Sequence, residues 1–409
     1  MHSVECIILP LCSQGIQMNN TNGISRRNFI SVIGLSLGTV ALSSSLSGCG
    51  MVEPVVDYGW SGPNADIQDI RLKVLAYAIL SPNPHNKQPW IIQLTGANSF
   101  DLYVDPERLL PATDPYYRQI HVGQGTFLET LVIAASGLGY LAEIHYFPQG
   151  EYSNAELENK PVASISLIKQ DNIKPDPLFN HLLDRHSNKR EYLNKPLNPA
   201  QLSELQTYNA SKSSHLTLVD SPQAQEKLVQ VLTQSMQIEV GDTERDLETI
   251  KMFRFNDTEM QQYRDGFGLA QGGVTGIKKV LVETFILSRE SVEKDPAEFS
   301  KQSVEIAHKT ASSTATFGWL TTATNTRLDQ VKIGREYCRI NLKTTAMGLA
   351  QHPMSQVLQE YQEMLPLQQE FKKHFNIKQS DTVQMLFRLG EAEAVNHSPR
   401  RTVTSIIKT

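Results

Sequence analysis

The chain has 409 residues, 40% of them hydrophobic and 20% charged, a composition typical of one large globular domain or two smaller ones. The formal net charge is −5 at pH 7, which gives no electrostatic case for binding nucleic acid. The cysteines are Cys6, Cys12, Cys49 and Cys338. Their spacing matches neither a zinc site nor a disulfide framework, so the sequence predicts no structural metal.

The first fifty residues resemble an export signal. The string Ser-Arg-Arg-Asn-Phe-Ile contains the paired arginines Arg26 and Arg27 of a twin-arginine pattern. The apolar run that follows, residues 30–46, is too short and too weakly apolar to predict a membrane span. It ends in Leu-Ser-Gly-Cys, which resembles a lipobox in which Cys49 carries lipid. A soluble signal peptide with a chance cysteine, or a buried helix, is the alternative.

We therefore expect residues 1–48 to be a signal peptide and residues 49–63 to be a tether. The twin-arginine pathway exports folded proteins and is often used when a cofactor must be inserted first. The protein is thus predicted to be a periplasmic or cell-envelope lipoprotein. Gly50 follows the anchor at the position where an Asp would signal retention in the inner membrane, so the outer membrane is preferred.

From Asn64 onward, apolar residues recur with helical spacing and predict a helix that ends at a polar loop, residues 81–90. Three prolines stiffen this loop and remove backbone donors, so we expect it to be extended. The polar groups must then come from the side chains of Asn83, His85, Asn86 and Gln88. Such a set suits a flat heterocycle with carbonyls and ring nitrogens. An ordinary helix-to-strand connection with a buried Trp90 is the alternative.

The core of this loop, His-Asn-x-Gln-Pro-Trp at residues 85–90, resembles the flavin loop of the nitroreductase superfamily, and more narrowly of its Acg-like FMN-binding branch. Residues 110–140 also resemble that branch over their whole length. In the superfamily the loop lies against the isoalloxazine ring of FMN. The resemblance therefore implies FMN as the cofactor, with Asn86 and Gln88 near the ring or the ribityl chain.

A basic cluster, Arg-His-Ser-Asn-Lys-Arg, occupies residues 185–190. We expect Arg185, Ser187 and Arg190 to lie at the end of a helix. Guanidinium groups bind phosphate through paired hydrogen bonds and Ser adds a neutral donor, so a phosphate monoester is a natural ligand. A solvated basic helix end is the alternative. In nitroreductases a segment of this kind binds the FMN phosphate, and the resemblance implies that role here.

Two later segments belong to the same interpretation. Residues 242–312 are predicted to be a charged, helical insertion, and similar segments in the Acg-like branch fold over the flavin as a lid. Surface decoration is the alternative for this insertion. Near the C-terminus, Arg400 and Arg401 resemble the basic segment that reaches the flavin phosphate in nitroreductases. A soluble, charged tail is the alternative there.

The expected fold is α+β, a mixed sheet flanked by helices in two related halves, residues 64–170 and 171–409. A weak internal echo, Ala-Ser-Gly-Leu at 135–138 and Ala-Met-Gly-Leu at 346–349, favours duplication. Nitroreductases are ordinarily homodimers with FMN at the subunit interface. The resemblance therefore implies a monomer that acts as an internal pseudo-dimer, with one FMN between its halves.

The function that the resemblance implies is that of an FMN-dependent oxidoreductase, in which the flavin passes electrons to a small-molecule acceptor. Outside the cytoplasm no steady pool of NADH or NADPH is available, so a quinol or a partner reductase becomes a candidate donor. No hydrolase constellation such as Ser–His–Asp is visible, and no catalytic residue is assigned. The alternative function is storage or sequestration of FMN without turnover.

Overall fold

The computed structural model describes residues 59–208, 214–285 and 287–408. The predicted signal peptide, the Cys49 anchor and most of the tether lie outside the described residues. None of the helices in the described part has the length and apolarity needed to cross a bilayer.

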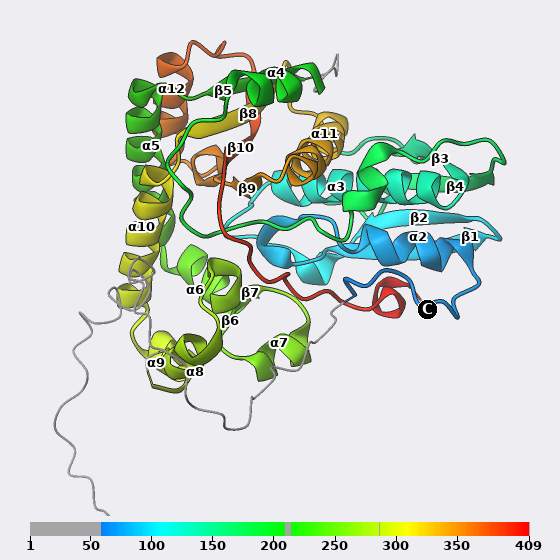
Figure 1. The fold of residues 1–409 in the computed structure, drawn as a ribbon, viewed down its shortest axis with the longest axis horizontal. Helices are drawn as coiled ribbons and strands as arrows, with labels where there is room; N and C mark the ends of the chain where they lie inside the picture. Colours follow the sequence, from blue (N-terminus) through cyan, green and yellow to red (C-terminus); the bar gives the residue numbers. More distant parts are fainter. Residues whose placement is uncertain (1–58, 209–213, 286, 409) are drawn as a thin grey trace, which may run out of the picture. The chain divides into compact units, whose positions relative to one another are not determined.

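The first half contains one four-stranded antiparallel sheet in the order β1-β2-β4-β3. Its elements are α2 (Ile70–Ala78), β1 (Trp90–Gly96), β2 (Ser99–Val104), α3 (Arg118–Gly137), β3 (Tyr140–Tyr146) and β4 (Ala163–Lys169), drawn in blue and cyan in Figure 1. The alternating pattern of β2 buries Phe100, Leu102 and Val104 in one core with Phe127 and Leu131 of α3. This core therefore holds α3 against the sheet.

The second half contains another four-stranded antiparallel sheet, in the order β5-β8-β10-β9. Its elements are α4 (Pro199–Tyr208), β5 (His215–Val219), β8 (Thr316–Thr322), α11 (Arg327–Ala346), β9 (Ala350–Pro353), α12 (Leu365–His374) and β10 (Thr382–Gly390). Every residue of β8 is buried. Phe317 and Trp319 belong to a core with Phe371 of α12, whereas Leu320 belongs to a core with Ile333 of α11. Helices thus cover both faces of this sheet.

Both sheets have the same topology. In each, the strands lie in the order first, second, fourth, third, and a 20-residue helix, α3 or α11, connects the second strand to the third. The α+β class is confirmed, with two antiparallel sheets in place of one mixed sheet. The shared topology is consistent with the duplication, which stays a prediction.

The helices α3 and α11 cross at two glycines. A Cβ atom on Gly125 would lie 1.9 Å from the carbonyl oxygen of Val331, and one on Gly334 would lie 2.0 Å from that of Val122. Contacts this short are impossible for a real side chain, so only glycine permits this approach. The two halves are therefore packed backbone to backbone at their centre (Figure 1).

A long insertion separates β5 from β8 (Figure 1). It contains α5 (Pro222–Val240), α6 (Thr243–Met252), β6 (Phe253–Arg254), α7 (Asp257–Tyr263), β7 (Phe267–Gly268), α8 (Gly276–Phe285), α9 (Arg289–Lys294) and α10 (Pro296–Ser312). The predicted 242–312 segment lies within it. On α6, the Glu248 carboxylate accepts hydrogen bonds from the backbone N–H groups of Ala112 and Thr113, at 3.1 and 2.9 Å. The insertion of the second half is thereby joined to the first half.

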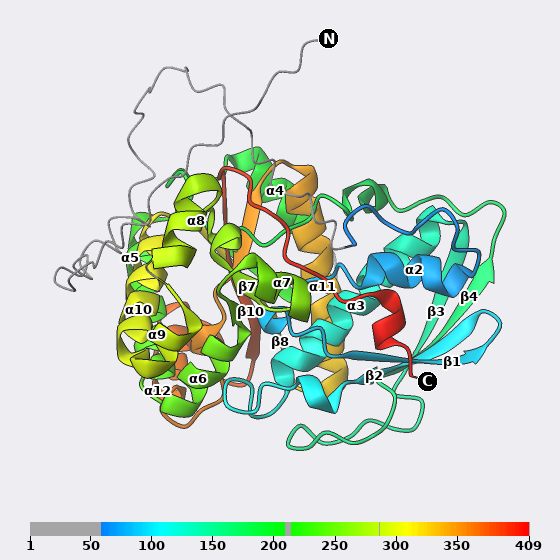
Figure 2. The ribbon, with the colours of Figure 1, turned by 90° about the horizontal axis from the view of Figure 1, so that it is seen from below.

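The chain crosses between the two sheets twice. After β4, the chain runs to the second sheet, where the N–H of Asn188 donates to the carbonyl of Gln351 at 3.1 Å. After β10, the C-terminal segment returns to the first sheet, where the N–H of Lys408 donates to the carbonyl of Ile92 at 2.8 Å. Figure 2 shows this segment, in red, ending beside β1. These two crossing segments carry both basic clusters predicted from the sequence.

Candidate functional site

The loop of residues 81–90 is tightly turned rather than extended, so the extended form that we predicted is wrong. Three of its non-glycine residues have positive φ angles: His85 (49°), Asn86 (52°) and Gln88 (54°). This left-handed conformation is uncommon outside glycine and must be held by its surroundings. Asn83 does part of this, because its Oδ1 accepts from the N–H of Gln88 at 2.7 Å and its Nδ2 donates to the Ser81 carbonyl at 3.2 Å.

The buried side chain of Asn86 joins the loop to two distant segments. Its Nδ2 donates to the carbonyl of Gly266 in the insertion at 2.9 Å and to that of Pro399 at 2.8 Å. Its Oδ1 accepts from the Arg400 guanidinium at 2.8 Å. Both polar atoms of the Asn86 amide therefore form hydrogen bonds that join the loop to these segments. That Asn86 also lies near a cofactor stays a prediction.

The side chain of Gln88 likewise joins the loop to the insertion and to the C-terminal segment. Its Nε2 donates to the carbonyl of Arg264 in the insertion, and its Oε1 accepts from the backbone N–H of Arg401, each at 2.8 Å. The insertion and the C-terminal segment also bind each other, since Arg264 Nε donates to the Arg400 carbonyl at 2.7 Å. Loop, insertion and C-terminal segment thus meet at one place.

Two guanidinium groups, those of Arg185 and Arg400, are brought together there. Both side chains are buried, and each donates to the same carbonyl oxygen of Leu80, at 2.9 and 3.1 Å. Arg185 also donates to the Asn341 side chain at 3.1 Å. Burial lowers the pKa of both guanidinium groups, and the Arg185 charge lowers that of Arg400 further. Among the described residues, no carboxylate pairs with either group.

This arrangement lacks a counter-charge. A buried charge without a partner costs several kcal/mol. Near the two guanidiniums, three buried polar atoms also have no hydrogen-bond partner in the described part of the chain: Arg400 Nε, His397 Nε2 and Ser81 Oγ. Burial, with the charges of Arg185, His186 and Arg400, lowers the pKa of His397 to about 4, so its ring is neutral at pH 7. We call Arg185, His397 and Arg400 the Arg185–Arg400 cluster; it fits a dianion such as a phosphate monoester.

A third cation, Lys189, lies nearby on the segment of residues 185–190. Its ammonium nitrogen is 3.6 Å from the centre of the Phe267 ring, which the insertion supplies. Burial lowers the pKa of Lys189 to about 8. The ring of His85 meets the same Phe267 edge-on at 5.9 Å, and burial followed by the Lys189 charge lowers the pKa of His85 to about 4. A cation thus lies beside the loop that resembles a flavin loop.

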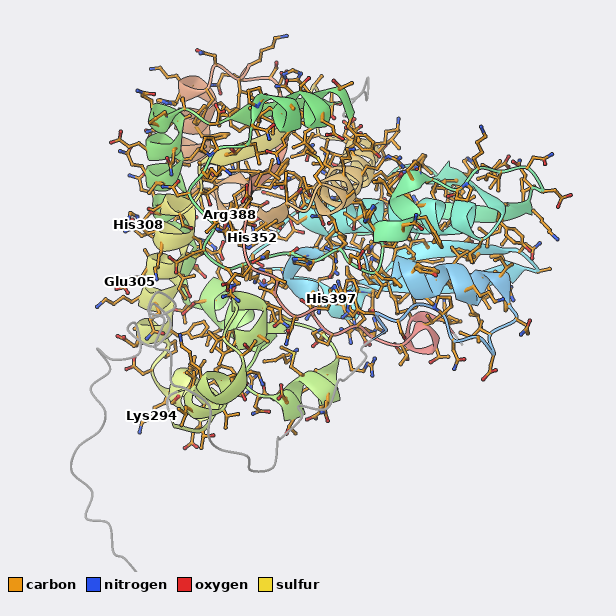
Figure 3. The ribbon with its side chains drawn as sticks, viewed as in Figure 1. Lys294, Glu305, His308, His352, Arg388 and His397 are labelled. Carbon is orange, nitrogen blue, oxygen red and sulfur yellow. The ribbon has the colours of Figure 1, made fainter. Side chains whose placement is uncertain are left out.

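Next to Lys189, the second sheet contributes a histidine. Arg388 Nε donates to His352 Nδ1 at 3.1 Å, which leaves the proton of a neutral His352 ring on Nε2 (Figure 3). Arg388 is itself buried and donates to the carbonyls of Thr310 and Arg190 at 3.1 and 2.7 Å. Burial lowers the pKa of His352 well below its ordinary value, and the charges of Arg388 and Lys189 add to this. His352 is thereby held as a neutral hydrogen-bond donor.

The remaining predicted residues are placed differently. Arg190 forms an ion pair with Glu393 and is partly exposed, while Arg401 pairs with Asp105 at 3.5 Å. Residues 185–190 do not lie at the end of an α-helix, because only a short 3-10 turn, Pro177–His181, precedes them. The half-buried Ser187 lies between Arg185 and Lys189 in the chain.

Sequence reasoning missed Lys189, His352 and Arg388. Lys189 was within reach, since it stands inside the predicted basic cluster. His352 and Arg388 carry no local signal, because they come from two strands of the second sheet. Within the described ranges, no group of His, Cys, Asp and Glu side chains could hold a metal ion.

Comparisons with known proteins find nitroreductases. No family model matches the chain. A Mycobacterium tuberculosis protein provisionally named an NAD(P)H nitroreductase, found in strains CDC 1551 and H37Rv, is 34% identical over 83 residues, or 20% of this chain. The matched stretch spans 24% of the length of these curated relatives. The sequence resemblance stated above therefore has support over part of the chain.

Solved structures give weaker likenesses. A protein of Anabaena variabilis, provisionally called a nitroreductase, has a TM-score of 0.41 at 9% identity, over 72% of this chain and 69% of its own. The FMN- and NADPH-dependent nitroreductase NfnB of Sphigopyxis sp. strain HMH has a TM-score of 0.35 at 14% identity, over 57% and 99%. With TM-scores below 0.5, these likenesses assign no function to this chain.

Proposed function

We propose that the protein is an FMN-binding oxidoreductase of the nitroreductase type. The observation that carries this proposal is the pair of buried guanidiniums, Arg185 and Arg400, which share the Leu80 carbonyl and pair with no carboxylate of residues 59–208, 214–285 and 287–408. A phosphate dianion supplies the missing negative charge. The left-handed loop with the sequence resemblance to flavin loops is bonded directly to Arg400 through Asn86.

In this proposal Arg185 and Arg400 bind the phosphate of FMN, which supplies hydride and electron transfer when bound. Lys189 stabilises negative charge beside the loop, where its ammonium makes no hydrogen bond within the described residues. His352 offers an Nε2–H donor from the second sheet. Phe267 packs against both Lys189 and His85. A positive charge at Lys189 would favour an anionic group of a ligand bound beside the loop.

The proposal includes an internal pseudo-dimer, which the shared strand order of the two sheets supports. We expect a yellow monomer with one FMN per chain, measured by absorbance together with mass in solution. A protein that stays colourless after incubation with FMN, or that carries FAD, would overturn the cofactor assignment. A stable dimer with two flavins per pair would overturn only the pseudo-dimer.

A second candidate is storage of FMN without turnover. It is favoured by one observation: the insertion is bonded to the loop at both Asn86 and Gln88 through its backbone carbonyls.

The identity of the electron donor is also part of the proposal. The name of the M. tuberculosis relative, and a Mycobacterium smegmatis neighbour solved with NADPH, favour a nicotinamide. Export would instead favour a quinol or a partner reductase.

We further propose that the protein is exported as a lipoprotein, with the outer membrane preferred. The support is the order of the twin-arginine pattern, the apolar run and the lipobox in the sequence. Replacing Arg26 and Arg27 together by Lys should leave the precursor inside the cell. Cys49→Ser should abolish labelling by radioactive palmitate. Unchanged fractionation and labelling in these variants would contradict this proposal.

A further inference from the structure

Trp60, in the segment that precedes α2, is docked on the C-terminal segment. Its indole N–H donates to the carbonyl of Ser398 at 2.9 Å, across 338 positions of sequence. Its ring stacks on that of His397, with centroids 3.9 Å apart and planes at 9°. The tether predicted for residues 49–63 therefore has a fixed contact at its end.

The same indole borders the Arg185–Arg400 cluster. The guanidinium carbon of Arg400 lies 5.0 Å from the centre of the indole ring, and that of Arg185 lies 5.6 Å from it. A cation over an indole face is attracted by the negative charge of the ring's π system, most strongly when the cation is desolvated. Trp60 thus offers partial compensation to both buried charges, and it touches the residues just before Arg400.

The segment that carries Arg400 is held from three directions. Trp60 binds His397 and Ser398 from the N-terminal side. From the insertion, Gln271 donates to the His397 carbonyl at 3.1 Å. From the loop, Asn86 accepts from the Arg400 guanidinium. Loss of any one of these contacts should leave the Arg400 guanidinium less firmly held in position.

We propose that Trp60 is a positioning residue of the phosphate site, through which the segment that precedes α2 is coupled to ligand binding. The proposal rests on the proposed function for the identity of the ligand. Trp60 acts by fixing His397 and Ser398, and through them Arg400. Because coupling between two binding events is reciprocal, a bound phosphate strengthens the docking of the Trp60 segment as much as docking strengthens phosphate binding.

Titration of the apoprotein with FMN and with riboflavin tests this. Trp60→Ala should weaken FMN binding by about tenfold, the equivalent of roughly 1.4 kcal/mol, and leave riboflavin binding unchanged. Trp60→Phe keeps a flat ring on His397 but loses the indole N–H, so it should restore part of the loss. Asp66→Ala, at an exposed position of the same N-terminal segment, is the matched control and should bind as the wild type does.

The outcomes separate the two proposals. Wild-type affinity of Trp60→Ala for FMN, or equal losses for FMN and riboflavin, would overturn the role of Trp60 and leave the proposed function standing. A wild-type protein that binds no FMN would overturn both. Thermal unfolding of each apoprotein is the control for folding. A midpoint close to that of the wild type would show that the change in affinity is not a folding defect.

Discussion

Arg185→Ala should weaken FMN binding by about 10- to 100-fold, because a hydrogen bond to a charged group contributes roughly 1.5–3 kcal/mol. Riboflavin lacks the phosphate and should be insensitive to the change. The matched control is Arg190→Ala, since the Arg190 charge is already paired with Glu393 at a partly exposed position. Fluorescence titration of the three proteins with both ligands measures the effect.

The same substitution has an expected signature in stability. In the apoprotein the Arg185 and Arg400 charges repel each other without a carboxylate between them. Removing one should therefore cost less than the loss of its hydrogen bonds suggests, so the thermal midpoint of apo Arg185→Ala should stay near that of the wild type. Loss of binding without loss of stability is what a ligand site predicts, because its residues are not optimised for stability. Equal weakening of FMN and riboflavin would place the phosphate elsewhere.

Arg185 and Arg190 show that the sequence could predict the basic motif but not its geometry. The motif itself was visible, and Arg185 is buried in the cluster with Arg400. The helix-end geometry assumed for the motif was wrong, because the segment has no helical structure. Lys189 lies against Phe267 of the insertion, whereas Arg190 pairs with Glu393.

Other features depend on contacts that no local pattern encodes. The bond between Asn86 and Arg400 joins positions 314 apart, and it becomes visible only once the C-terminal segment crosses to the first half. The shared topology was hidden for a similar reason. The insertion separates β5 from β8 in the second half, whereas β1 and β2 are adjacent in the first. The α+β class could be predicted because it depends on local periodicity alone.

The contacts between the insertion and the first half determine which reductants we expect to reach a bound flavin. Besides its bonds to Asn86 and Gln88, it binds the first half through Asp265, whose carboxylate lies 3.0 Å from the Arg108 guanidinium. Glu248 adds the contact to Ala112 and Thr113 described above. Hydride transfer requires the reacting atoms to be within about 3–3.5 Å, with the donor ring stacked on the acceptor. We propose that an insertion bonded to the loop in this way excludes a nicotinamide ring unless the insertion is displaced.

We therefore expect little bleaching of bound FMN by NADPH under anaerobic conditions, and ready reduction by a small reagent such as dithionite. Glu248→Gln weakens the link from α6 to the first half without touching the Arg185–Arg400 cluster, so it should accelerate bleaching by NADPH more than bleaching by dithionite. Stopped-flow absorbance of both proteins with each reductant measures this. Fast, saturable bleaching of the wild type by NADPH would contradict the fixed insertion and favour a nicotinamide-dependent enzyme. Slow bleaching by both reductants, in both proteins, would favour storage, because a flavin that small reagents cannot reach does not turn over.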